Sequence, residues 1–398
     1  MSTSMTPTSS TSSTSSSQST TKSKSNKPTP PKLNTNLKRK SSIKNRNEKF
    51  VESNAWTIGF IISFFVILFS KEISNIYNAN NEDYQLLKTS MNSTPKLSSW
   101  KITKLDHQDR GYGLIATRQI LPGELLLKEK PIFKLNSKIR SIEDYETNLN
   151  SILKKLDGED RNRFLSLSNP WQNQSLSNIS NYIRILQTNA ISIGSNQLAI
   201  FPSLSRINHG CAGASNSVYN WREKEGVEVV HATKLIEVGE EILISYWDSK
   251  RSRSDRQDYL KSNYGFQCTC QTCSLTEEES IQSDQRFLKI NQLKAKLSDW
   301  SNRLIGGFEA VRLIEEAVQL MKLQNMTFEF GQLYADAAHI ASAHSDFQSV
   351  KHFANLAQDH FKIELGSDSI EVLISKKLIK NPTSLNWSNR QPERVKVL

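Results

Sequence analysis

The sequence contains few cysteines and few hydrophobic residues. It has 398 residues, of which four are Cys and 37% are hydrophobic. Four Cys exclude a scaffold built on disulfide bonds, because small secreted domains of that kind are dense in cysteine. The length still suffices for two or three domains with a sizeable core, while the excess of Ser, Thr and Asn indicates that part of the chain does not fold.

Acidic residues are nearly absent from the N-terminal segment 1–54. This segment holds ten Lys and Arg but two Asp and Glu, so +8 of the formal net charge of +11 belongs to it. Its beginning, up to Thr21, consists almost entirely of Ser and Thr. Residues 1–54 are therefore predicted to be a disordered basic tail. Such a tail binds nucleic acid only nonspecifically, and the run Lys38-Arg39-Lys40 resembles a nuclear-import signal, although a solvated tail is the simpler interpretation.

Long hydrophobic runs are also scarce, with one exception at residues 55–70. This run carries no charge. A membrane-spanning helix needs about 20 apolar residues, with about 17 as the lower end, so a buried helix and a membrane anchor both remain open. The composition favours the anchor, through which the chain would associate with a membrane. Residues 71–99 are predicted to be a linker, and the folded part is expected to begin near Trp100.

The location of the protein stays open at this point. Basic residues before the apolar segment would place the tail in the cytosol. The acid-poor, Ser-rich start is also similar to a mitochondrial transit peptide, although its basic residues are mostly Lys. Membrane-anchored, cytoplasmic and nuclear locations are the alternatives that the sequence leaves.

Glycine is used sparingly, and two of the fifteen Gly residues bracket Tyr112. The motif Gly111-Tyr112-Gly113 precedes a short apolar run, and a Pro122-Gly123 turn and a second apolar run follow, which predicts two strands. Paired glycines let a backbone approach a ligand closely, but an ordinary hairpin turn would explain them as well.

Two further motifs place polar side chains beside strands. Asn208-His209-Gly210-Cys211 follows an apolar run, and Tyr246 ends the strand pattern that begins after Gly239. The first motif sets two hydrogen-bonding side chains and a thiol beside a tight turn. The phenol of Tyr246 either points into a cleft or donates to a backbone carbonyl, as buried tyrosines commonly do.

Three of the four cysteines lie close together, in a Cys-x-Cys-x-x-Cys motif. Structural zinc takes four ligands in a tetrahedron at about 2.3 Å, so three thiolates on one loop need a fourth. The alternative, one disulfide with two spare thiols, would require an oxidising compartment. The sequence therefore predicts one zinc ion with four thiolate ligands: Cys211, Cys268, Cys270 and Cys273.

Together and in this order, the four motifs resemble the SET domain of protein lysine methyltransferases. They are most similar to the SET/MYND-type group and related fungal SET proteins, over about residues 100–275. The resemblance implies an α+β fold with small β-sheets at 100–250, a helical insert at about 134–198, and a post-SET zinc segment at 251–275.

The resemblance also implies roles for individual residues. S-adenosylmethionine would be held by the glycine motif, the Asn-His pair and two aromatic residues, namely Gly111, Tyr112, Gly113, Asn208, His209, Tyr246 and Phe266. Tyr246 would be the catalytic residue, beside the methyl group and a lysine amine of a partner protein. A free lysine has a pKa of about 10.4, so a desolvating channel is needed to favour the neutral amine.

Two departures from the family pattern motivate an alternative function. Gly210 stands where the family usually has Ser, and the turn from Ala212 to Asn216 is longer than in the family. An upstream Cys/His cluster is missing, so the MYND zinc module is not expected. The alternative is a SET-fold adaptor without catalysis that binds a protein partner and is tethered to a membrane.

Residues 276–398 are predicted to be helical. Ile290, Leu293, Leu297, Trp300 and Leu304 recur at spacings of three and four, and further stripes run from Val311 to Met321 and from Ala354 to Phe361, as amphipathic helices require. This part of the sequence resembles the tetratricopeptide-like region of SET/MYND proteins, and its expected role is to support the SET domain structurally. Four His residues in this region have irregular spacing and are not expected to bind metal.

Overall fold

The computed structural model describes residues 98–105, 110–138, 141–172, 180–194, 196–384 and 389–396. All of them belong to one compact unit, residues 49–398. The predicted tail at 1–54, the apolar segment at 55–70 and the linker up to residue 97 lie outside the described residues. No helix within the described ranges is long and apolar enough to cross a membrane.

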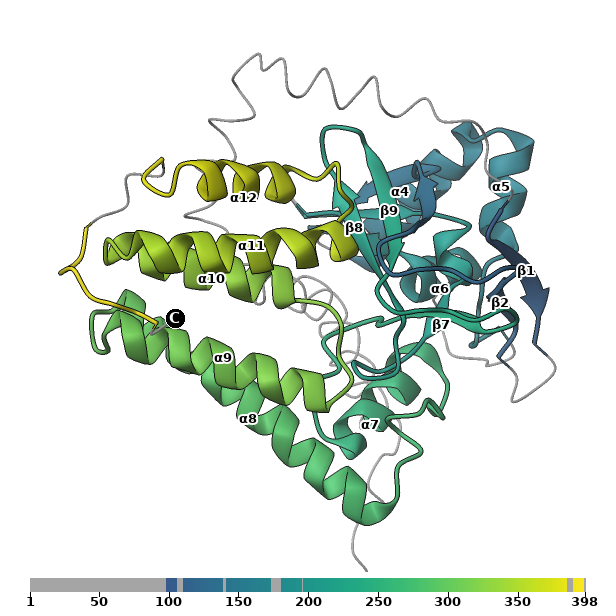
Figure 1. Ribbon diagram of the computed structural model, residues 1–398. Coiled ribbons are helices and arrows are strands. Elements are labelled where there is room, and N and C mark those ends of the chain that lie inside the picture. Colours follow the sequence, from purple (N-terminus) through teal and green to yellow (C-terminus); the bar gives the residue numbers. More distant parts are fainter. Residues whose placement is uncertain are drawn as a thin grey trace, which may run out of the picture. The chain divides into compact units, whose positions relative to one another are not determined.

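Ten short strands form three small sheets in the part of the chain where a SET domain is predicted (Figure 1). The first sheet has the order β1 (Trp100–Lys104), β2 (Tyr112–Ala116), β10 (Glu241–Ile244) and β7 (Asn208–His209). The second has β3 (Leu125–Glu129), β9 (Val227–Ala232) and β8 (Ser217–Arg222). The third has β4 (Phe133–Asn136), β6 (Gln197–Ile200) and β5 (Ile191–Ser192).

The first sheet joins segments that are far apart in the sequence. β10 pairs antiparallel with β2, where Glu241 lies opposite Ile115, and parallel with β7, where Leu243 lies opposite Asn208. Apolar side chains of β2 and β10, including Leu114, Ile242 and Ile244, are buried in a common core. Because burial fixes the register, the sheet brings the glycine motif, the Asn-His pair and the strand before Tyr246 to one place.

The predicted helical insert contains three helices: α4 (Ile142–Lys155), α5 (Gly158–Leu165) and α6 (Asn181–Asn189). Each begins at a residue whose side chain accepts a backbone N–H, namely Ser141, Asp157 and Ser180. The segment at about 134–198 also includes most of the third sheet, because β4 lies at its beginning and β6 at its end. In β4, Phe133 and Leu135 are buried and alternate with exposed Lys134 and Asn136, as expected of a strand with one face covered.

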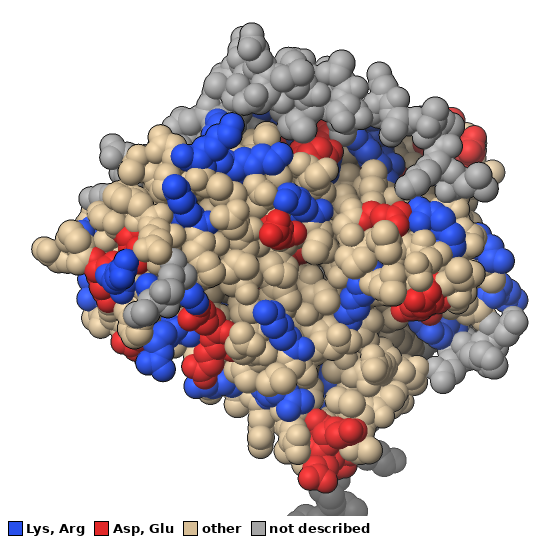
Figure 2. Space-filling model, in the orientation of Figure 1, with Lys and Arg blue, Asp and Glu red and all other residues tan. Residues whose placement is uncertain are grey.

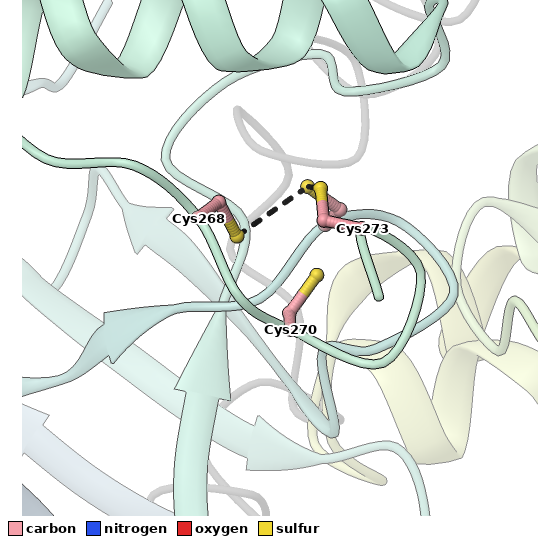
Figure 3. Close-up of side chains that lie close together, drawn as sticks. Cys268, Cys270 and Cys273 are labelled. Carbon is pink, nitrogen blue, oxygen red and sulfur yellow. Dashed lines mark hydrogen bonds between the residues drawn. The ribbon is translucent and has the colours of Figure 1, made fainter. Parts of the chain in front are cut away.

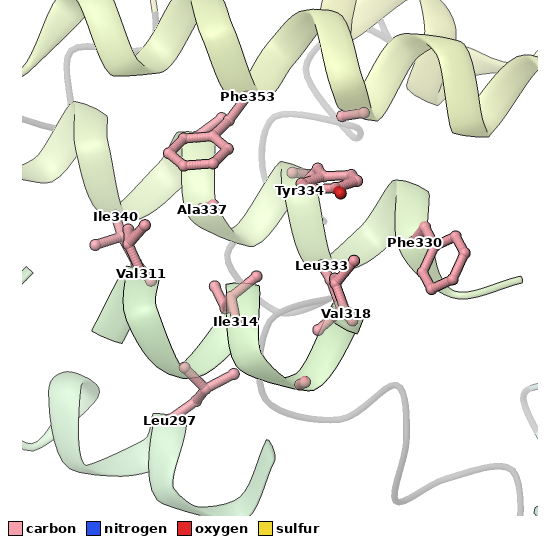
Figure 4. Packing of buried hydrophobic residues seen from close by; sticks show 14 of the residues in the cluster. Leu297, Val311, Ile314, Val318, Phe330, Leu333, Tyr334, Ala337, Ile340 and Phe353 are labelled. Atoms are coloured by element: carbon pink, nitrogen blue, oxygen red, sulfur yellow. The ribbon is translucent and has the colours of Figure 1, made fainter. Parts of the chain in front are cut away.

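After β10 the chain is mainly helical. α7 (Arg253–Tyr264) ends at Gly265, whose left-handed backbone conformation suits glycine, and the cysteine loop follows. Five helices then pack each on the next: α8 (Glu277–Ser301), α9 (Gly307–Leu323), α10 (Phe330–Ala343), α11 (Phe347–Glu364) and α12 (Ile370–Lys380). Figure 4 shows their core, in which Ile314 and Val318 of α9 lie near Leu333 of α10.

Most of the predicted helical stripes are buried in this core. Val311, Ile314, Val318 and Met321 are at most 1% exposed. Leu304 does not continue the stripe of α8, because that helix ends at Ser301 and leaves the Leu304 side chain 72% exposed. The helices differ widely in length, from α12 to the much longer α8, so a tetratricopeptide-like repeat stays a prediction.

Two groups of charged residues fix the helical region to the sheets. Arg222 of β8 forms a two-pronged ion pair with Asp368, at 2.6 and 2.7 Å. After β10, the buried Lys250 pairs with Glu329 at 2.6 Å, and Lys294 of α8 pairs with the same carboxylate. These pairs are buried or half-buried, so removing one partner would leave the other as a costly uncompensated charge.

On the face of the molecule in Figure 2, positive and negative side chains are interspersed.

Candidate functional site

The glycine motif opens strand β2 and needs both of its glycines. Gly111 has a positive φ, a backbone conformation that strongly favours glycine, and a Cβ there would have no atom within 4 Å. At Gly113, by contrast, a Cβ would lie 2.7 Å from Glu241 Oε1 and 3.0 Å from Asn208 Nδ2. The first glycine thus leaves an open backbone position, and the second allows close packing. Tyr112 between them is 49% exposed.

Asn208 is fastened to this turn by two hydrogen bonds. Its Nδ2 donates to the carbonyl oxygen of Tyr112 at 3.2 Å and to Glu241 Oε1 at 2.8 Å. The second oxygen of Glu241 pairs with Arg110 at 2.8 Å. Glu241 was not singled out from the sequence, although its place in the Gly-Glu-Glu strand pattern is a signal that could have drawn attention to it.

His209 lies at the centre of the site, and its two ring nitrogens face different neighbours. Nδ1 accepts a hydrogen bond from the backbone N–H of Tyr246 at 3.1 Å, and Nε2 lies 3.3 Å from the sulfur of Cys211. Burial lowers the pKa of His209 to about 4, so the ring is neutral at neutral pH. Because Nδ1 accepts, the single proton sits on Nε2 and is donated to the sulfur.

Tyr246 lies two residues beyond Ile244, the last residue of β10, close to the strand end at which the sequence pattern places it. Its hydroxyl donates to the carbonyl oxygen of Ile207 at 2.9 Å, and its ring centroid lies 5.2 Å from that of His209. Burial raises the pKa of Tyr246, so the hydroxyl keeps its proton at neutral pH and acts as a donor rather than as a base.

Further aromatic rings, not recognised in the sequence as part of the site, surround Tyr246. The ring centroid of Tyr264, at the end of α7, lies 4.9 Å from that of Tyr246. Tyr259 stacks on Trp247 with a distance of 3.7 Å between ring centroids and an interplanar angle of 9°. Phe266, predicted from the sequence, lies 6.3 Å from His209. Tyr264 stands two residues before Phe266 in the sequence, which is its only signal, and nothing in the sequence marks Tyr259.

The four thiols converge beside these rings, as Figure 3 shows for the cysteine loop. All four sulfur atoms lie within 4.8 Å of one another, and Cys211 Sγ is 4.0 Å from Cys268 Sγ and 3.5 Å from Cys273 Sγ. Four ligands at about 2.3 Å from a tetrahedral centre would be about 3.8 Å apart. The spacing, burial and chemistry of these donors therefore fit one zinc-sized cation.

Hydrogen bonds from neighbouring elements hold the cysteine loop and the turn at Cys211. Gln257 of α7 accepts from the Cys268 N–H at 2.8 Å and donates to the Cys268 carbonyl oxygen at 2.7 Å. On the other side, Ser249 Oγ accepts from the N–H of Ala212 at 2.7 Å. The loop is therefore positioned by protein contacts as well as by the thiols.

The structure also explains the two departures in the Asn-His-Gly-Cys turn. A Cβ at Gly210 would lie 2.9 Å from the backbone nitrogen of Ser215, because the longer turn folds back over this position. Asn216 is buried, accepts from the N–H of Leu243 at 2.8 Å, and donates to the carbonyl oxygen of Glu241 at 2.9 Å. The longer turn thus still returns Asn216 to β10.

Other candidate sites lie apart from this cluster. A cavity of about 630 Å³ in the helical region is lined by Arg312, Glu315, Tyr334 and Lys396 among others, and includes none of the predicted site residues. Among the described residues, the four cysteines are the one group of three or more Cys, His, Asp or Glu placed to hold a metal ion. The described His residues of the helical region belong to no such group.

Comparison with known proteins finds matches for the segment that carries these motifs. The SET domain family matches residues 111–247. Histone-lysine N-methyltransferase set5 of Schizosaccharomyces pombe is 26% identical over 286 residues, which make up 69% of this chain and 82% of that protein. N-lysine methyltransferase SMYD2 of Gallus gallus is 37% identical over 95 residues, covering 24% of this chain and 20% of that protein.

Two more distant likenesses complete the comparison. Human histone-lysine N-methyltransferase SMYD3 is 31% identical over 108 residues, covering 25% of this chain and 24% of that protein, so the match to both SMYD proteins spans about a quarter of their length or less. The solved structure of Rubisco LSMT bound to AdoMet covers 78% of this chain and 91% of that chain. Its identity of 13% and TM-score of 0.31 are too low to carry an argument.

Proposed function

Because this chain is a SET-domain protein related to named lysine methyltransferases, we propose that it transfers a methyl group from S-adenosylmethionine to a lysine side chain of a protein, histone or non-histone. The observation that carries the proposal is that Asn208, His209, the open Gly111 turn and Tyr246 lie together at one small sheet. The bound cofactor would supply a reactive sulfonium methyl group, which leaves binding, alignment and exclusion of water to the protein.

The residues around the glycine turn have properties that suit a bound cofactor. No atom lies within 4 Å of the position that a Cβ of Gly111 would take, and Tyr112 is exposed. The side-chain amide of Asn208 donates to the carbonyl oxygen of Tyr112. His209 is neutral and therefore adds no positive charge beside a sulfonium. In this proposal Gly111, Tyr112, Gly113, Asn208, His209 and Phe266 bind the cofactor.

Tyr246 is the proposed catalytic residue. Its hydroxyl is fixed by the Ile207 carbonyl, and the rings of Tyr246 and Tyr264 lie 4.9 Å apart. A lysine amine entering beside such rings loses water, and desolvation favours its neutral, nucleophilic form. Since the Tyr246 hydroxyl keeps its proton, the proton of the lysine would leave to solvent rather than to this residue.

A structural zinc ion is the second part of the proposal. Cys211, Cys268, Cys270 and Cys273 would supply all four ligands, which leaves no position open for substrate and makes the site structural rather than catalytic. The distances of 4.0 and 3.5 Å from Cys211 Sγ to two of the other sulfur atoms lie on either side of the tetrahedral spacing and support this assignment. The ion would join the loop after α7 to the turn after His209.

The proposal is tested with the full chain, loaded with zinc under reducing conditions. We expect calorimetry to show binding of S-adenosylmethionine, and labelled cofactor to transfer methyl groups to lysine in histones or in a mixture of other proteins. If the zinc-loaded chain neither binds the cofactor nor transfers methyl groups, the proposal is wrong, and the adaptor alternative would account for a SET fold without cofactor binding.

The variant Tyr246→Phe tests the role of the hydroxyl. We expect transfer to fall by about tenfold or more, because about 1.4 kcal/mol of lost alignment in the transition state corresponds to a factor of ten. Tyr145→Phe is a matched control, since Tyr145 in the insert also donates to a backbone carbonyl, that of Ser137 at 3.0 Å. Equal effects of the two variants on transfer would contradict a catalytic role for Tyr246.

A further inference from the structure

Arg256 is a fully buried arginine on an otherwise polar helix. α7 buries two residues, Arg256 and Leu260, which lie one turn apart on the same face. Leu260 packs directly in the cluster that contains the buried cysteines, so this face of α7 lies against the thiols. Arginine keeps its charge in proteins, and placing that charge in a core is costly unless an anion compensates for it.

The contacts of Arg256 account for only part of its guanidinium group. Nη1 donates to the carbonyl oxygen of Arg251 and, at 3.3 Å, to Asp284 of α8. Nε and Nη2 are buried and have no hydrogen-bond partner within the described part of the chain. Buried donors are nearly always paired in folded proteins, so two unpaired donors on one cationic group indicate a missing acceptor.

The thiol groups are the candidates for that acceptor, because they pack against Leu260 on the same face of α7. Gln257, the residue after Arg256 on α7, is hydrogen-bonded to both the N–H and the carbonyl oxygen of Cys268, so α7 lies directly on the cysteine loop. Neutral thiols are weak acceptors and carry no charge. When a divalent cation binds, the four thiols lose their protons to solvent, and the centre carries a formal charge of −2.

We propose that Arg256 is the counter-ion of the cysteine metal centre, a positioning residue whose buried guanidinium neutralises the charged thiolates through Nε and Nη2. This inference rests on the proposed zinc site. It gives Arg256 two anionic partners, Asp284 of α8 and the metal centre. Metal binding would thereby strengthen the attachment of the cysteine loop to the first helix of the helical region.

Metal affinity provides the test, because it is read without any measurement of activity. The full chain is stripped with a chelator under reducing conditions and titrated with Co²⁺, whose thiolate complexes absorb visible light, and then with Zn²⁺ in competition with an indicator. For Arg256→Met, which keeps an unbranched apolar stem but removes the guanidinium group and its charge, we expect roughly 10- to 100-fold weaker binding, as for other partners of metal ligands. Arg256→Lys should recover part of the loss. Lys261→Met, on the exposed side of α7, is the control and should bind as the wild type does.

The possible outcomes separate the two proposals. If the wild type binds no metal with a thiolate spectrum, the zinc site itself is wrong. If the wild type binds and a folded Arg256→Met chain binds within about twofold of it, the counter-ion inference alone is overturned. If Arg256→Met does not fold, the variant Asp284→Asn decides between the two roles. Metal affinity should be undiminished if Arg256 neutralises the thiolates. A loss of affinity as large as that predicted for Arg256→Met would make Arg256 a structural partner of Asp284 and overturn the inference.

Discussion

The thiols and the aromatic rings of the site belong to one small buried cluster but are held together by different forces. Cys211, Cys268 and Cys273 pack there with Leu260, and the rings of Trp247, Tyr259, Tyr264 and Phe266 lie against them. The aromatic half is complete without any further component, since stacking and burial stabilise it. The thiol half places four sulfur atoms close together, an arrangement that a bound cation would make favourable.

His209 connects the two halves. One ring nitrogen accepts from the backbone of Tyr246 on the aromatic side, and the other donates to Cys211 on the thiol side. The comparison therefore predicts an asymmetry. Substitution of a thiol should also disturb the position of Tyr246, because His209 contacts both. Substitution of an aromatic ring should leave the affinity for zinc unchanged.

The largest effect is expected from Cys268→Ser, which removes one of the four proposed zinc ligands. Loss of a bound metal belongs to the mechanisms that cost more than about 4 kcal/mol of unfolding free energy, so we expect a large fall in stability and a loss of bound zinc. Urea unfolding and elemental analysis measure the two effects. Ser274→Ala, in the same loop and without a thiol, is the control, and equal stability of the two variants would contradict the zinc site.

An intermediate effect is expected from His209→Phe, which keeps a ring of similar size but removes both hydrogen bonds. It leaves the N–H of Tyr246 without its acceptor, at a cost of about 1–3 kcal/mol. It also removes a partner of a proposed metal ligand, so zinc affinity should fall by roughly tenfold. Both are measured on the same preparation, by urea unfolding and by competition with an indicator.

His360→Phe is the matched control for this substitution. His360 packs against Phe330 at 5.0 Å in the helical region, far from the thiols along the chain, and should leave zinc affinity unchanged. If His209→Phe lowers stability without changing zinc affinity, the two halves are not connected through this ring, and the expected asymmetry is lost.

The two halves also differ in how far the sequence predicts them. The thiol set follows from the sequence because the spacing of three cysteines is unusual and a single further thiol is available. Tyr246 and Phe266 follow from the motifs that contain them. Tyr259 and Tyr264, by contrast, join the site only because α7 packs against the segment that carries Tyr246 and Trp247. A tyrosine on a polar helix gives no sign of such packing in the sequence.

The same distinction holds for the fold. Short alternating strands and the helical stripes could be predicted from local patterns. Leu304 could not, because its spacing continues the stripe while the chain has already left the helix at Ser301. Glu241 could not be predicted either, since charged residues are usually solvated, and only its hydrogen bond with Asn208 shows that it belongs to the site.

The smallest effect is expected from Trp247→Phe in the aromatic half. The Trp247 ring stacks on Tyr259, and its buried Nε1 has no hydrogen-bond partner among the described residues. Replacing it with Phe loses contact area but also removes a buried unpaired donor, which itself costs about 1–3 kcal/mol. The two effects oppose each other, so the unfolding free energy should change by less than about 1 kcal/mol, and zinc affinity should not change.

Trp247→Ala, which loses the whole ring, should instead cost about 3–5 kcal/mol. A loss of zinc affinity in the stable Phe variant would mean that the rings, and not only His209 and the thiols, hold the metal centre together.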